Sequence, residues 1–390
     1  MPGSEGFNTV GAAPEAPAPN LVPNVALQQL SGSAMPRRNT ALESLRQLCA
    51  LVSPFSTRDQ LLADWPSDPP WQALLAQADT HRLLPALSVA LARHGLEDRV
   101  DADVADILAA VADWNTERNE GFRRQMRVLS AAFNAAGLEP VWLKGALTLL
   151  PAHGPADGRL MMDLDVWFAG ESRQRAAMAV LRGLGYASES EVAGPRHYPP
   201  FFHPGEMARV ELHCTIVGPH EALLPVDVAA AGVESLDWDG LRIARLDPLS
   251  RVLCSLAQCT SPDSERLATA EVPLMKALDF ATRIHDDFGG VVPPALIARV
   301  RETGWERSTQ RLLTLTESFF GLPNPLASDP ALVRMLERIT SWPRWHHSLK
   351  AFRSLFGAGG RMVLANPRRA PAMVSHYVAR LIAPGAPKER

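Results

Sequence analysis

The sequence predicts an α+β protein in which a small sheet-forming core lies between two helical regions. Short apolar segments of strand composition fall within residues 139–245 and alternate there with a helical segment. On both sides of this core, apolar residues recur at the three- and four-residue spacing of amphipathic helices. We therefore expect five parts: a disordered tail over 1–37, a helical region over 38–138, the core over 139–245, a C-terminal helical region over 246–358 and a basic tail over 359–390.

The composition excludes several classes of protein. The 39 basic and 42 acidic residues nearly cancel, so no strong positive field favours nucleic acid as a partner. Four cysteines without a C-x-x-C pair favour a reducing compartment and argue against a disulfide framework or a structural zinc site. No apolar run approaches the roughly 20 residues of a transmembrane helix, and no export signal is recognisable. The expected localisation is cytoplasmic.

The N-terminal third combines a tail with predicted helices. Residues 1–37 are rich in Pro, Ala, Gly, Asn and Ser without a periodic pattern, which is typical of disorder. A helical apolar stripe follows over 71–93, after a helix start capped near Thr57. A long helix is predicted over 102–136, with Gly137 as its C-terminal cap.

Two carboxylates stand out in the core. Asp163 and Asp165 flank one leucine and are followed by V-W-F, so they are expected on a strand. Residues i and i+2 of a strand share a face and lie roughly 6.6 Å apart. Their mutual repulsion would raise their pKa values unless a cation lies between them. Mg²⁺, which prefers carboxylate oxygens, is the expected cation. The alternative is that one aspartate caps a turn while the other is solvated.

A lysine and a glycine precede this pair. Residues 140–143 have strand composition, Lys144-Gly145 form a sharp exit, and 146–150 are expected to begin a helix. Glycine permits close approach of a ligand, and the start of a helix attracts anions. Lys144 adds a full charge and is one of only four lysines. This pattern indicates a phosphate site, although an exposed surface lysine is the alternative.

A third acid follows in a predicted strand over 209–217. Alternation there places Glu211 and His213 on one face and the apolar residues on the other. Glu211 could therefore face the same site as the aspartates, or it could pair with an arginine on the sheet surface. The spacing of four nearby histidines matches no standard zinc pattern, so zinc is not expected. These histidines are His197, His203, His213 and His220.

The C-terminal part is predicted to be helical over 248–259, 273–288 and 294–320. Lys276 and Asp279 lie three residues apart on one helix face, as a solvated ion pair would. Residues 341–390 contain nine basic side chains and one acid, interleaved with aromatic residues. Such a segment could dock on an anionic partner or a membrane surface, or could be a solvated basic face with a packed apolar side.

The motifs L-K-G-A-L, R-x-x-x-D-x-D and V-E-L-H, in this order, resemble the uncharacterised bacterial nucleotidyltransferase family of the DNA polymerase β type superfold. The resemblance covers about residues 70–290 and implies a small mixed sheet with helices. It implies that Asp163, Asp165 and Glu211 form the metal and catalytic site. It also implies that Lys144 and Gly145 bind nucleotide phosphates. The turn departs from the superfold pattern, which has Gly-Ser where this chain has Lys-Gly.

The expected activity is transfer of a nucleotidyl group from a nucleoside triphosphate to an unknown acceptor, with Mg²⁺ as cofactor. The acceptor could be a small molecule, a peptide or a protein. Glu211 would complete the metal site or accept the acceptor's proton. Arg159 would join Lys144 and Gly145 in binding phosphate. The alternative is a nucleotide-binding or scaffold protein that keeps the fold without catalysing transfer. In addition, polar residues of the 273–288 helix are expected to pack toward the active cleft, as in the family.

Overall fold

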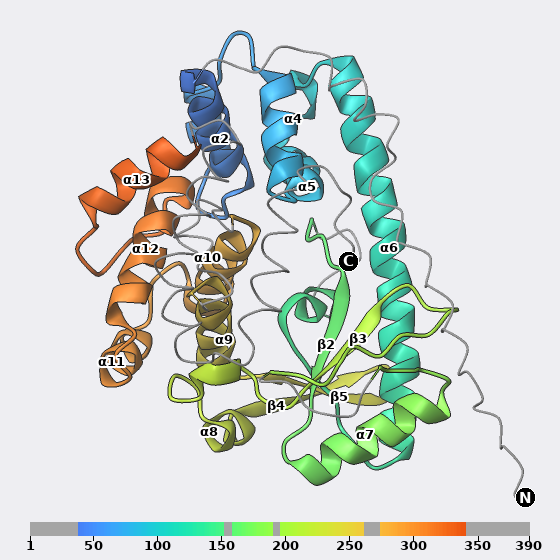
Figure 1. Cartoon of the computed structure of the whole chain (residues 1–390). Coiled ribbons are helices and arrows are strands. Elements are labelled where there is room, and N and C mark those ends of the chain that lie inside the picture. The colour runs from blue at the N-terminus through green and yellow to red at the C-terminus, as the bar shows by residue number, and fades with distance from the viewer. Residues whose placement is uncertain (1–37, 152–157, 190–195, 261–273, 341–390) are drawn as a thin grey trace, which may run out of the picture.

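A computed structural model describes residues 38–151, 158–189, 196–260 and 274–340. The tails predicted over 1–37 and 359–390, and the whole basic segment over 341–390, lie outside the described residues. Within them, a five-stranded mixed sheet is surrounded by helices (Figure 1). The predicted α+β class, with helical regions on both sides of a small mixed sheet, is confirmed.

The sheet has the strand order β3-β2-β1-β5-β4. Strand β1 is antiparallel to β2 and parallel to β5, whereas β2 and β3 are parallel and β4 and β5 antiparallel. The strands are β1 (Val141–Trp142), β2 (Asp163–Trp167), β3 (Arg209–His213), β4 (Val233–Trp238) and β5 (Leu241–Leu246). The strand predicted over 209–217 therefore ends at His213, four residues earlier than expected.

The hairpin of β4 and β5 was not anticipated from the sequence. Its turn is Asp239-Gly240, and both residues have positive φ, 52° and 83°. A two-residue turn with positive φ at both positions matches the twist of a hairpin, and Asp-Gly is a favoured sequence for it. Asp237 supports the turn, because its Oδ1 accepts a hydrogen bond from the Gly240 N–H at 3.1 Å. The Asp239-Gly240 dipeptide in the sequence therefore indicated a β-hairpin at this position.

The N-terminal helices lead to one long helix. They are α2 (Arg38–Val52), α3 (Arg58–Ala63), α4 (Trp71–Thr80), α5 (Leu84–His94), the 3₁₀ turn η1 (Glu97–Arg99) and α6 (Ala102–Ala135). Helix α6 confirms the prediction over 102–136 and runs along one side of the molecule from the N-terminal helices to the sheet (Figure 1). The stripe over 71–93 belongs to two helices, because the chain turns after α4 through Arg82 at φ 60°.

The remaining helices follow the core strands. They are the 3₁₀ helix η2 (Lys144–Leu149), α7 (Glu171–Gly183), η3 (Gly218–His220), α8 (Val226–Ala231), α9 (Pro248–Thr260), α10 (Leu274–Phe288), α11 (Pro294–Glu302), α12 (Glu306–Phe320) and α13 (Pro330–Thr340). The helix predicted over 294–320 is divided, because Gly304 adopts φ 74° between α11 and α12. The remaining predicted C-terminal helices appear as α9 and α10.

The two faces of the sheet pack into different hydrophobic clusters. Leu164 and Val166 of β2 lie in a cluster with Phe133 of α6 and Leu181 of α7. Trp167 of β2 lies in the other cluster, which unites the N-terminal helices with α9, α10 and α12. Because successive strand residues point to opposite faces, Asp163 and Asp165 share the face of Trp167. The acids are therefore directed toward the side of the sheet where the C-terminal helices pack.

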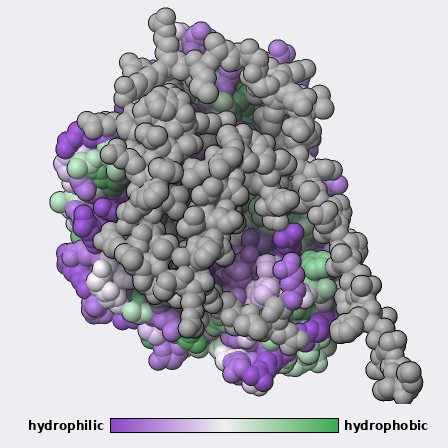
Figure 2. Space-filling view, viewed as in Figure 1, coloured by the Kyte–Doolittle hydropathy of each residue, from purple (hydrophilic) through white to green (hydrophobic). Residues whose placement is uncertain are grey.

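The described surface offers no large apolar patch on the visible face. Where described residues can be seen, hydrophilic residues predominate and hydrophobic ones form small separate patches (Figure 2). The large hydrophobic side chains that are exposed, Val128, Met207, Val228 and Val291, are scattered along the chain. Single exposed apolar residues of this kind are normal. Among the described helices, none has the length and apolar character needed to cross a membrane.

Candidate active site

The predicted acids meet on adjacent strands. In the parallel register of β2 and β3, Asp165 is the direct partner of Glu211, and Trp167 is the partner of His213. Asp165 is buried, and Glu211 keeps 18 % of its side chain exposed. The register therefore puts Glu211 on the face of the Asp163–Asp165 pair, as expected. No arginine lies within 4.0 Å of its carboxylate among the described residues, which removes the surface ion pair as an explanation.

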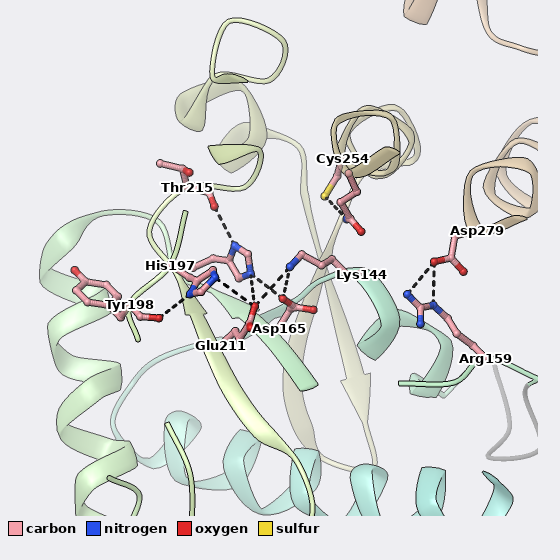
Figure 3. A network of polar contacts seen from close by, with 11 residues as sticks. Lys144, Arg159, Asp165, His197, Tyr198, Glu211, Thr215, Cys254 and Asp279 are labelled. Atoms are coloured by element: carbon pink, nitrogen blue, oxygen red, sulfur yellow. Dashed lines mark hydrogen bonds and ion pairs between the residues drawn. The ribbon is translucent and has the colours of Figure 1, made fainter. Parts of the chain in front are cut away.

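Lys144 reaches this cluster from the end of β1. Its Nζ lies 2.5 Å from Asp165 Oδ1 and 3.8 Å from Glu211 Oε2 (Figure 3). The side chain is only 21 % exposed, and the backbone has φ 51°, a strained value for a residue with a Cβ. The alternative of an exposed surface lysine is therefore wrong: the ammonium group is the cation nearest to the acids.

Two histidines complete the cluster. His213 Nε2 lies 2.8 Å from Asp165 Oδ1, and His197 Nε2 lies 3.7 Å from Glu211 Oε2. His197 arrives because its segment runs antiparallel along β3, with bridges from His197 to His213 and from Phe201 to Val210. The segment therefore extends the edge of the sheet beside β3. Alternation along β3 indicated the place of His213, but no local signal indicated that of His197.

Repulsion and burial shape the acidity of the cluster. Burial raises the pKa of Asp163, and the neighbouring Asp165 raises it further. Burial, and then the charges of Asp165 and Asp163, raise the pKa of Glu211 to about 8. Burial would also raise the pKa of Asp165, but Lys144 and His213 together hold it well below its usual range. Asp165 is thus ionised, whereas Glu211 favours its neutral form at neutral pH and the pKa of Asp163 is shifted in the same direction.

The charge of Lys144 is secured by the acids. Burial alone would lower the pKa of its ammonium group, but the nearby carboxylates of Asp165 and Glu211 raise the pKa above its ordinary value. Asp163 has no hydrogen bond or ion pair within the described part of the chain. One ammonium group therefore faces three carboxyl groups, and the cluster is short of positive charge.

Gly145 is closely packed by two side chains. A Cβ at this position would lie 2.9 Å from Met161 Sδ and 3.4 Å from Arg159 Cζ. The segment after it is the six-residue 3₁₀ helix η2 rather than the expected α-helix, so the argument from a helix dipole does not apply. Binding of phosphate by Gly145 stays a prediction.

Arg159 is joined to the C-terminal helices. Its Nε donates a hydrogen bond to Asp279 Oδ2 at 3.0 Å (Figure 3). Its Nη1 donates to the Leu160 carbonyl oxygen at 2.9 Å. Asp279 of α10 therefore points inward to the loop before β2, and the picture of a solvated pair with Lys276 does not describe its main contact. Polar residues of α10 do face the site, as the resemblance implied.

A pocket adjoins Lys144 on the side of α9 and α10. Its polar lining includes Ser255, Gln258, Asp279 and Arg283. Arg283 Nη2 lies 3.5 Å from the Lys144 carbonyl oxygen, and no carboxylate of the described chain lies within 4.0 Å of its guanidinium. Burial lowers the pKa of Arg283 despite the charge of Asp279. The pocket thus contains a buried cation without a direct ion pair, which sequence reasoning did not identify.

A mixed sheet with an Asp-x-Asp pair, a third acid on the adjacent strand and a lysine among them is consistent with a nucleotidyltransferase-type fold. The family model of an uncharacterised nucleotidyltransferase family matches residues 67–321. The chain belongs to this family, which confirms the resemblance and indicates an enzyme of nucleotidyl transfer. Comparisons with curated proteins and with solved structures gave no match.

Proposed function

We propose that the protein transfers a nucleotidyl group from a nucleoside triphosphate to an acceptor, with Mg²⁺ bound at Asp163, Asp165 and Glu211. The observation that carries the proposal is the convergence of these acids from β2 and β3 on one buried face beside Lys144. Three carboxyl groups at one place cost stability unless cations compensate them. A bound Mg²⁺ would compensate the negative charge of the carboxylates, and the phosphates of the substrate would in turn interact with the ion and with Lys144.

The donor set fits a divalent ion. Carboxylate oxygens are the ligands that Mg²⁺ prefers, and it usually keeps water and substrate phosphates as its other ligands. Asp163, whose carboxyl group has no hydrogen bond or ion pair within the described residues, would offer such an oxygen next to the ionised Asp165. A bound ion would supply charge stabilisation for the triphosphate and for in-line displacement.

The cations around the pocket are suited to hold phosphate. Lys144 and Arg283 both line it, and Arg159 lies next to its wall through Asp279. With a metal ion held by Asp165, the Lys144 ammonium group would be available to a phosphate oxygen. Arg283, Lys144 and Gly145 would then orient the triphosphate between the pocket and the acids.

The transfer itself needs a positioned acceptor and a proton acceptor. The acceptor oxygen attacks the α-phosphorus, the bond from this phosphorus to the bridging oxygen breaks, and pyrophosphate leaves. If the acceptor is a hydroxyl group, its proton passes to Glu211, the partly exposed acid of the cluster. The position of Glu211 therefore supports two roles, that of a proton acceptor and that of a metal ligand.

The test is transfer of label from α-labelled nucleoside triphosphates, with and without Mg²⁺, in the wild type and in Asp163→Asn and Asp165→Asn. Both substitutions are expected to abolish the labelled product and the Mg²⁺-dependent thermal stabilisation by nucleotide. Asp106→Asn, at an exposed position of α6, is the matched control. If the wild type binds nucleotide without consuming it, the chain is a nucleotide-binding protein of this fold and transfer is refuted.

A further inference from the structure

The geometry points to a second metal position on the histidine side of Asp165, where His213, His197 and Glu211 complete a mixed nitrogen and oxygen donor set for a transition-metal ion such as Zn²⁺. This inference rests on the proposed function, because Asp165 and Glu211 would serve both this ion and the Mg²⁺ position. The two positions differ in their ligands: the Mg²⁺ position uses carboxylates only, whereas the second position also uses the histidine nitrogens.

Both histidines present the same nitrogen to the acids. The Nδ1 of His213 lies 3.2 Å from the Thr215 carbonyl oxygen, and the Nδ1 of His197 lies 2.7 Å from the Tyr198 carbonyl oxygen (Figure 3). A carbonyl oxygen can only accept a hydrogen bond, so each of these contacts supports the tautomer with the hydrogen on Nδ1. In that tautomer each Nε2 offers its lone pair to a metal ion. Histidines that bind metals are commonly held in this way by a backbone carbonyl.

These lone pairs face carboxylate oxygens. His213 Nε2 lies 2.8 Å from Asp165 Oδ1 and 3.9 Å from Glu211 Oε2, and His197 Nε2 lies 3.7 Å from the same Glu211 oxygen. In the protein without metal, His213 Nε2–H can donate to the ionised Asp165 Oδ1. A metal ion bound between these atoms would take the place of that hydrogen, which Nδ1 would then carry. The arrangement is therefore one that a cation would stabilise.

The separations suit ligands of one ion. Ligands bound at about 2.1 Å lie about 3.0–3.4 Å apart in octahedral or tetrahedral sites. The ligand atoms of Asp165, Glu211 and His213 all lie within 4.8 Å of one another, and among the described residues these three form the group that meets this criterion. The contact of 3.9 Å between His213 Nε2 and Glu211 Oε2 exceeds the range by about half an ångström. His197 Nε2 lies 3.7 Å from Glu211 Oε2 but outside this group of three, so its ring would have to shift toward Asp165 and His213 to become a fourth donor.

The donors select the kind of ion. Carboxylates and water suit Mg²⁺, whereas imidazole suits Zn²⁺ and its neighbours in the transition series. A centre with two imidazole nitrogens and carboxylate oxygens is therefore matched to Zn²⁺, with Co²⁺ as a spectroscopic substitute. Of the four histidines near in sequence, His203 and His220 lie elsewhere, against Tyr186 and Trp305.

Lys144 competes for this position. Its ammonium group contacts the same Asp165 Oδ1 as His213 does, so a metal ion must displace it. The pocket that Lys144 also lines gives the side chain a place to move, toward Asp279 and the proposed phosphate site. Removing the lysine charge should strengthen metal binding at the histidines, whereas removing a histidine should weaken it.

The test uses purified, metal-free full-length chain titrated with Zn²⁺, and with Co²⁺ read by its visible spectrum. One Zn²⁺ per chain should bind with an affinity at least about 100-fold above that for Mg²⁺. His213→Gln should weaken Zn²⁺ binding by about 100-fold or more, since loss of an outer-shell partner alone costs roughly 10–100-fold. Because His213 is fully buried, the more exposed His197→Gln is the second variant, with an expected loss of roughly tenfold.

Two further variants make the test specific. Lys144→Gln should tighten Zn²⁺ binding by roughly tenfold, as expected when one competing charge is removed. His285→Gln, at an exposed histidine that contacts Asp286, should leave Zn²⁺ binding unchanged. Zn²⁺ binding that is equally tight in both site-histidine variants and the wild type would overturn the inference. Mg²⁺-dependent transfer without Zn²⁺ binding refutes the inference alone, and Zn²⁺ binding at the histidines without transfer refutes only the proposed function.

Discussion

Two groups of buried charge differ in their balance. Arg251 is buried, lies 2.6 Å from Asp287 and 3.6 Å from Glu234, and donates to the Leu246 carbonyl oxygen at 2.8 Å. Glu234 also accepts a hydrogen bond from Arg245 at 2.9 Å. Two arginines thus face two acids. In the candidate active site, Lys144 faces three carboxyl groups.

The balanced group around Arg251 stabilises the fold, whereas the unbalanced group around Lys144 is suited to bind a cation. Arg251 contacts both the Leu246 carbonyl oxygen of β5 and Asp287 of α10, so it joins these two elements. Removing one partner of such a buried ion pair would leave an uncompensated charge and destabilise the fold. In the group around Lys144, burial and then the excess of acid raise the pKa values of Asp163 and Glu211. An excess of buried acid is costly in the protein alone and becomes favourable when a cation binds. The comparison therefore predicts opposite effects of substitution in the two groups.

The largest expected effect is on catalysis. Glu211→Gln should lower nucleotidyl transfer by roughly 10²–10⁴-fold, the usual contribution of a positioned general base. It should leave the free energy of unfolding unchanged or raise it, because a neutral amide replaces an acid that is costly to ionise there. The measurements are the transfer rate and chemical unfolding.

Leu212→Asp is the matched control for Glu211, because it lies next in β3 and faces the opposite cluster. It should unfold the chain by placing an unpaired charge in that cluster. A destabilised Glu211→Gln beside a well-folded Leu212→Asp would contradict the register of β3.

Arg251→Met should cost about 3–5 kcal/mol in the free energy of unfolding, because Asp287 would remain buried without its partner. Arg245→Met is the matched control, since it contacts the same Glu234 from a more exposed position. It should cost less than about 1 kcal/mol. If urea unfolding shows equal losses in the free energy of unfolding for the two variants, the group around Arg251 does not have this stabilising role.

Lys144→Ala should weaken binding of a nucleoside triphosphate by roughly 10–100-fold, in the range of a charge-assisted contact of about 1.5–3 kcal/mol. Binding of the corresponding nucleoside should change little, because the lost interaction is with phosphate. Isothermal titration of both ligands measures the ratio. Equal losses for the two would indicate a collapsed turn at Gly145, not a lost phosphate contact.

The smallest effect concerns pH. The folded pKa of Glu211 is raised to about 8 from an ordinary value of 4.5, so the folded chain binds more protons than the unfolded chain between these values. The contribution of this group to stability is therefore fully present below about pH 4.5 and is lost as the pH rises through about 8. Glu211→Gln should flatten this part of the stability curve, as should saturating Mg²⁺. An unchanged slope in both cases would contradict the raised pKa.

The sequence by itself determined the local elements and the class of protein. The i, i+2 spacing of Asp163 and Asp165 and the alternation around Glu211 indicated strand faces correctly, because side-chain direction in a strand depends only on neighbouring residues. The motif order identified the family, and the periodicity of α6 gave the long helix. The roles assigned to the site residues stay predictions.

Only the tertiary structure decided which other side chains meet these acids. His197 arrives through an antiparallel bridge to β3, Asp279 reaches Arg159 from α10, and Arg283 reaches the carbonyl group of Lys144 from the same helix. Lys144 and Asp279 are separated by 135 positions in the numbering, yet line one pocket. Such contacts depend on how the helices pack against the sheet. This packing is determined by burial of apolar faces across the whole chain, so it cannot be predicted from a short stretch of sequence.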